Sequence, residues 1–158
     1  VLCGDGPLIR ASTLQALLDT HTQTNAAGTL ATAVIPNPKG YGRIVRSEAG
    51  AFERIVEHKD ATEEQRSIPE VNPSYYCFNA GHLFGQLARI SNDNAGGEYY
   101  LTDVFQLMLD ANQHVGVVDA VPPEDVLSIN TMSDLEEVER YLLARSETVE
   151  PSTKETSR

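Results

Sequence analysis

The sequence predicts an α/β domain in which helices cover both faces of a mainly parallel sheet that carries an inserted β-hairpin. Three observations favour this class. Apolar, β-branched runs alternate with segments of helical periodicity, and loops rich in Gly, Pro and Asn separate them. The polar clusters fall on those loops. A length of 158 residues with 41% hydrophobic residues suits one domain with a real core.

The first half of the chain is predicted to hold a short strand, a helix, a buried strand and a hairpin. Val1 and Leu2 form an apolar run that the glycines and proline of residues 4–7 end. Ser12 is a candidate cap for a helix whose leucines recur at helical spacing to about Thr24. The strands predicted next cover 29–35, 43–46 and 52–57.

The second half is predicted to add further strands and helices after a polar connector, residues 60–69. The predicted strands cover 75–78 and 115–121. The predicted helices cover 82–90, the segment capped by Thr102, and a last segment that starts at Ser133. Residues 147–158 are polar and read as a tail or linker, so the predicted domain spans 1–146.

Composition excludes several classes of protein. The formal charge of −11 disfavours nucleic-acid binding, because phosphate contact needs clustered Lys and Arg. Cys3 and Cys77 are too few for a disulfide framework and lack zinc-site spacing. Two reduced thiols favour a cytoplasmic protein, and no apolar run approaches the ~20 residues that a membrane span needs. The chain opens on an apolar run without Met, which favours a fragment truncated at the N-terminus.

A cation site is one reading of two of the polar clusters. Asp5 lies between glycines at the end of the first predicted strand, and Asn130 follows the apolar Ile129 before the last helix. Carboxylate and amide oxygens suit Mg²⁺, which usually takes one or two protein oxygens plus phosphates and water. The structural alternative is that Asp5 belongs to a turn and that Asn130 caps a helix.

A sugar site is one reading of three further positions. Gly42 offers a backbone amide where a side chain would clash, Glu57 ends a hairpin strand, and Asn72 carries an amide. Each has an ordinary alternative, namely a loop end, a solvated strand end and an Asn-Pro turn. No Ser, His and Asp pattern supports a protein nucleophile.

The segment GEYYLTD, residues 97–103, concentrates aromatic, hydroxyl and carboxylate groups where a helix should begin. Together with YGRIV at 41–45, IVEHKDAT at 55–62 and EVN at 70–72, it resembles the pyrophosphorylase domain of bacterial N-acetylglucosamine-1-phosphate uridyltransferases. The likeness runs from Val1 to about Leu143. It implies a Rossmann-like nucleotidyltransferase fold.

The resemblance implies an Mg²⁺-dependent reaction of UTP with N-acetylglucosamine 1-phosphate that yields UDP-N-acetylglucosamine, a cell-envelope precursor, and pyrophosphate. By motif match, Asp5 and Asn130 would hold Mg²⁺, and the acetylated sugar would meet Gly42, Glu57 and Asn72. The nucleotide-sugar pocket would be bordered by four more residues: Cys3, Gly4, Tyr100 and Thr102.

This chain departs from the family pattern in three respects. Cys3 replaces the usual Tyr, and Ser128 replaces the usual Gly. The basic, Gly-rich phosphate loop and the β-helix acetyltransferase domain, which makes the parent a homotrimer, are absent from these residues. The piece alone is therefore expected to be inactive. Two alternatives stay open: a non-catalytic remnant that binds sugar nucleotides, and a transferase for another sugar 1-phosphate.

Overall fold

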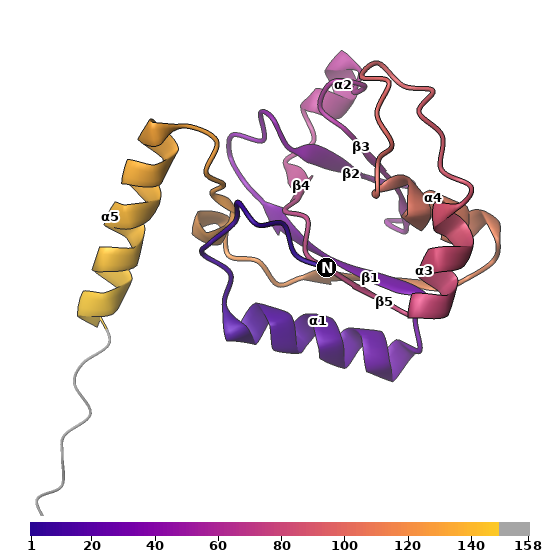
Figure 1. The fold of residues 1–158 in the computed structure, drawn as a ribbon, viewed down its shortest axis with the longest axis horizontal. Coiled ribbons are helices and arrows are strands. Elements are labelled where there is room, and N and C mark those ends of the chain that lie inside the picture. The colour runs from indigo at the N-terminus through magenta and orange to yellow at the C-terminus, as the bar shows by residue number, and fades with distance from the viewer. Residues whose placement is uncertain (149–158) are drawn as a thin grey trace, which may run out of the picture.

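The computed structural model describes residues 1–148, which form a mixed six-stranded sheet flanked by helices (Figure 1). The strands are β1 (Gly28–Val34), β2 (Gly42–Arg46), β3 (Phe52–Val56), β4 (Glu70–Asn72), β5 (Tyr76–Phe78) and β6 (Val115–Asp119). The helices are α1 (Ala11–Thr24), α2 (Glu63–Arg66), α3 (Ala80–Leu87), α4 (Asp103–Asp110) and α5 (Met132–Thr148), besides a 3-10 turn, η1, over Pro123–Val126. The α/β class and the inserted hairpin are confirmed. Most of the predicted tail lies outside the described residues.

Strand β1 lies inside the sheet and has partners on both edges. β6 runs parallel to it along one edge, while β5 and β4 run antiparallel along the other. The register changes by two residues between the pairs Thr29–Cys77 and Ala33–Val71, across a bend at Ser74 with φ of 64°. β2 pairs with β4, and β3 pairs with β2, both antiparallel.

The predicted mainly parallel pairing is wrong. β1 with β6 is the one parallel pair among the strands of residues 1–148. A parallel neighbour needs a long crossover, which α3 and α4 provide before β6. β4 and β5 instead return along β1 after the hairpin and the four-residue α2, so they run in the opposite direction.

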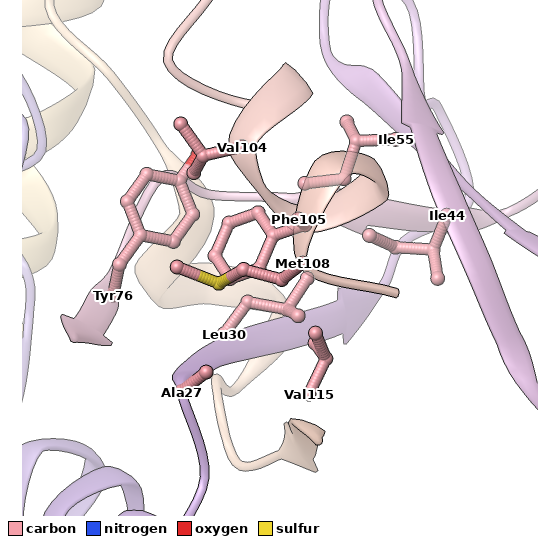
Figure 2. Close-up of a cluster of buried hydrophobic side chains, with 9 residues drawn as sticks. All are labelled: Ala27, Leu30, Ile44, Ile55, Tyr76, Val104, Phe105, Met108 and Val115. Carbon is pink, nitrogen blue, oxygen red and sulfur yellow. The ribbon is translucent and has the colours of Figure 1, made fainter. Parts of the chain in front are cut away.

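Two apolar clusters cover the two faces of the sheet. On one face α4 inserts Phe105 and Met108 against Leu30 of β1 and Tyr76 of β5 (Figure 2). The Phe105 ring centroid lies 5.2 Å from that of Tyr76. On the other face α1 packs Leu17 against small β1 residues. The first cluster fixes the start of α4 beside the end of β3.

Several local predictions are corrected. α1 begins at Ala11 with Arg10 in the cap position, so Ser12 lies inside the helix. The polar connector contains α2, which a capping box of Thr62 and Gln65 begins. Val1 and Leu2 do not form a buried strand: they are exposed, and Leu2 makes an isolated bridge to Tyr75.

Two further boundaries differ from the sequence prediction. α3 begins at Ala80, two residues before the predicted start. The Asn79 side chain caps it by accepting hydrogen bonds from the backbone amides of Gly81 and His82. Residues 70–72 form strand β4 instead of a turn. None of the described helices is long and apolar enough to cross a bilayer.

Candidate functional site

A cavity of about 370 Å³ opens where β3 and β4 end and β2 begins. The residues predicted from sequence that line it are Asp5, Gly42, Glu57, Asn72 and Asn130. A second cavity of about 230 Å³ shares Glu57 with the first, and Cys3, Tyr100 and Thr102 line it. Gly4 lines neither cavity. Eight of the nine predicted residues thus surround two adjoining hollows.

Gly42, Glu57 and Asn72 lie side by side because three strands present them in register. Gly42 of β2 pairs with Asn72 of β4, and Glu57 follows the pair that joins Val56 of β3 to β2. A Cβ on Gly42 would lie 3.0 Å from Ile55 Cγ2 and 3.4 Å from Glu57 Oε2. The missing side chain therefore leaves space beside the carboxylate, where a ligand can reach backbone.

Glu57 is a half-buried carboxylate with one hydroxyl partner. The Thr102 hydroxyl donates to Glu57 Oε1 at 3.0 Å. Burial raises the pKa of Glu57, the Thr102 hydrogen bond opposes that rise, and the carboxylates of Asp60, Glu98 and Asp103 add to it. Ionised Glu57 is an acceptor with free lone pairs, which suits sugar hydroxyls.

Thr102 occupies the cap position of α4 but does not cap the helix with its side chain. Its hydroxyl turns to Glu57 instead. Thr102 therefore connects α4 to the site. Its hydrogen bond to Glu57 lies at the boundary between the two cavities.

The Asn72 side chain is held rigidly. Its Nδ2 donates to the Tyr76 hydroxyl at 2.7 Å, and its Oδ1 accepts from the Ser74 amide at 3.1 Å. Burial raises the pKa of Tyr76 to about 12, so the phenol stays protonated. One N–H and one lone pair of the Asn72 amide remain for a ligand, which is what an acetamido group needs.

Asp5 and Asn130 lie on two loops that a backbone hydrogen bond joins, from the Ile129 amide to the Asp5 carbonyl at 2.8 Å. Asn130 Nδ2 donates to the Ser128 hydroxyl at 3.1 Å, which leaves the amide oxygen for another partner. Ser128, which departs from the family pattern, thus helps to orient Asn130.

The oxygen atoms of Asp5 and Asn130 suit a hard cation whose remaining ligands are not protein groups. Within residues 1–148 no three His, Cys, Asp or Glu side chains gather as a metal centre. Asp5 and Asn130 offer one carboxylate and one amide oxygen in the same cavity. Mg²⁺ bound through so few protein oxygens takes its remaining ligands from water and phosphates.

Sequence reasoning missed two charged residues of the first cavity, Asp134 and Lys39. Asp134 accepts from the backbone amides of Asn130 and Thr131, and these hydrogen bonds lower its pKa. The spacing of Thr131 and Asp134 is that of a helix-capping pair, a signal that could have found it. Burial and the neighbouring Asp5 raise the pKa of Cys3 to about 11, so its thiol is neutral.

Comparison with known proteins decides the family. The family model described as nucleotidyl transferase matches residues 1–146. The chain belongs to the nucleotidyl transferase family. The bifunctional protein GlmU of Brevibacillus brevis is 49% identical over 145 residues, which are 92% of this chain and 32% of that protein. GlmU of Bacillus subtilis is 43% identical over 145 residues, which are again 92% of this chain and 32% of that protein.

The nucleotidyl transferase domain described here spans about a third of the length of these curated relatives. Its fold is also similar to that of a Bacillus anthracis protein solved as a candidate glucose-1-phosphate thymidylyltransferase in complex with a sucrose. The TM-score is 0.59 at 12% identity, over 78% of this chain and 46% of that one. This likeness supports the transferase fold.

Proposed function

We propose that this domain supplies the sugar-binding side of an enzyme that transfers a uridylyl group from UTP to N-acetylglucosamine 1-phosphate, giving UDP-N-acetylglucosamine and pyrophosphate for cell-envelope synthesis. The chain by itself stays predicted to be inactive. The observation that carries the proposal is the row of Gly42, Glu57 and Asn72 in one cavity with Asp5 and Asn130. The identity to GlmU proteins supports it.

In this proposal the row recognises the sugar. Glu57 accepts hydrogen bonds from two sugar hydroxyls, the Gly42 backbone approaches the ring, and the Asn72 amide binds the acetamido group. Tyr100 and Thr102 border the sugar from the second cavity. Cys3 lines that cavity too. The family resemblance assigns Cys3 and Gly4 to the nucleotide-sugar pocket.

Asp5 and Asn130 would hold Mg²⁺, which would neutralise charge on the phosphates when bound. A phosphate oxygen of the sugar 1-phosphate attacks the α-phosphorus of UTP, and the bond from that phosphorus to pyrophosphate breaks. The residues of this chain orient the attacking sugar phosphate and hold its hydroxyls, which lowers the entropic part of the barrier. The trimeric assembly and cytoplasmic location implied by the resemblance stay predictions.

Calorimetric titration of this chain with UDP-N-acetylglucosamine and Mg²⁺ tests the proposal, using Glu57→Gln and the matched control Glu53→Gln on the exposed part of β3. Because charge-assisted hydrogen bonds contribute about 1.5–3 kcal/mol, we expect Glu57→Gln to weaken binding at least about tenfold. Glu53→Gln should bind as the wild type does. Absence of binding to the wild type, or equal losses in both variants, would contradict the proposal.

A further inference from the structure

Lys39 is the one basic side chain among the described residues that line the first cavity. The carboxylates there are Asp5, Glu57 and Asp134. A sugar phosphate that enters this cavity would meet three negative groups and a chain with a net charge of −11. Recognition of the phosphate by the chain itself therefore depends on where positive charge lies.

A tight turn holds Lys39 at the cavity. The Tyr41 amide donates to the Pro38 carbonyl at 3.3 Å, and Gly40 follows Lys39 with φ of 91°, as in a type II turn. The Tyr41 hydroxyl donates to the Val126 carbonyl at 3.0 Å and fixes the turn to the opposite side of the cavity. The backbone at Lys39 is thus fixed while its side chain stays exposed.

The side chain of Lys39 is available to a ligand. Within the described part of the chain it forms no ion pair. A lysine ammonium is a compact charge with three donors on a flexible stem, so it can follow a phosphate oxygen over several positions.

Positive charge gathers behind the same turn. Arg43 is 1% exposed, and its guanidinium donates to the carbonyls of Tyr41 and Arg66 without a carboxylate partner among the described residues. Its Nη2 lies 3.4 Å from His58 Nδ1. Burial, followed by the charges of Arg43, Arg66 and Lys39, lowers the pKa of His58. The field on this side therefore favours an anion, although the chain as a whole is acidic.

We propose that Lys39 is a specificity-determining residue that binds the phosphate of the sugar 1-phosphate. The inference rests on the proposed function and adds to it a contact that none of the predicted site residues provides. The Lys39 ammonium donates to phosphate oxygens, so the cavity prefers a phosphorylated sugar to the free sugar even without a bound cation.

NMR titrations of this chain in magnesium-free buffer test the inference with N-acetylglucosamine and N-acetylglucosamine 1-phosphate. The variants are Lys39→Gln and Lys39→Arg, and the control is Lys59→Gln, an exposed lysine outside both cavities. For the wild type we expect about five- to tenfold tighter binding of the phosphate. Lys39→Gln should lose that preference without weaker binding of the free sugar, while the other two variants keep it.

Three outcomes would overturn the inference. Lys39→Gln could keep the preference, both glutamine variants could lose it equally, or the wild type could bind the free sugar without preferring the phosphate. Each leaves the sugar site of the proposed function standing. A wild type that bound neither ligand would contradict the proposed function itself, and the inference with it.

Discussion

Glu57 lines a cavity although burial and negative neighbours both disfavour an ionised carboxylate there. Burial and the carboxylates of Asp60, Glu98 and Asp103 raise its pKa, and the Thr102 hydroxyl is the group that opposes them. A purely structural glutamate would not need to be buried among other carboxylates at a cavity with a single hydroxyl partner. A carboxylate kept short of hydrogen-bond donors is ready to accept them from a ligand.

Binding of UDP-N-acetylglucosamine should therefore depend on pH through Glu57. Its pKa in the folded protein lies above the ordinary value of about 4.3, so the ionised acceptor is lost as pH falls through that raised value. We expect affinity to decline on acidification earlier than an ordinary glutamate would cause. Calorimetry across pH, with Glu57→Gln as control, checks this. An equal decline in Glu57→Gln would assign the titration to another group.

Single residues were predictable from sequence where their type and their loop position agreed. Glu57 follows β3, Asn72 ends β4, and Asp5 follows the isolated bridge at Leu2; all three line the cavity. Lys39 was missed because a lysine in a Pro-rich turn is usually solvated, and its position at the cavity depends on the long-range bond from Tyr41 to Val126.

At the scale of elements, the site exists because β2, β3 and β4 lie in one register. Alternating apolar residues made the β2 and β3 hairpin predictable. Strand β4 was not, because it has three residues, precedes a proline and pairs with β1 and β2 over a long sequence separation. The same limit explains the overestimate of parallel pairing, since strand direction depends on such pairings.

Substitution of Gly42 by Ala tests the register argument. The new Cβ would lie 3.0 Å from Ile55 Cγ2 and close to the Glu57 carboxylate. Either β3 must shift, or the methyl group must occupy the space beside Glu57 that a ligand would use. We expect binding of UDP-N-acetylglucosamine to fall at least about tenfold, while overpacking lowers the free energy of unfolding by about 1 kcal/mol. Calorimetry and urea denaturation measure the two quantities.

Gly85→Ala is the matched control for Gly42→Ala. Gly85 lies in α3, where a Cβ meets open space, so alanine should stabilise the helix by about 0.5–1 kcal/mol and leave binding unchanged. Normal ligand affinity in Gly42→Ala would show that the space beside Glu57 is not used.

At the scale of the whole molecule, a buried ion pair joins three distant segments. Asp125 of η1 is fully buried and binds the Arg10 guanidinium, while Arg145 of α5 lies 3.4 Å from Asp125 Oδ1 and donates to the Leu8 carbonyl at 3.0 Å. This contact holds the N-terminal loop beside the segment that carries Asn130. Sequence alone could not reveal it, because Arg10 and Asp125 are 115 residues apart.

Asp125→Asn should therefore destabilise the fold. Loss of one partner of a buried pair costs about 3–5 kcal/mol, and the partial exposure of Arg10 reduces the expected loss in unfolding free energy to about 2–3 kcal/mol. Glu124→Gln is the control, since this exposed carboxylate binds the same arginine and should cost less than about 1 kcal/mol. Urea denaturation measures both, and similar small losses would show that the buried contact is not what holds the segments.

The proposed function requires this nucleotidyl transferase domain to select an acetylated sugar nucleotide. Calorimetric comparison of UDP-N-acetylglucosamine with UDP-glucose, both with Mg²⁺ and the wild-type chain, measures that selectivity. Because the rigid Asn72 amide keeps one donor and one acceptor for an acetamido group, we predict at least about tenfold tighter binding of the acetylated ligand. Equal affinities for the two ligands, or tighter binding of UDP-glucose, would contradict selection of the acetylated sugar.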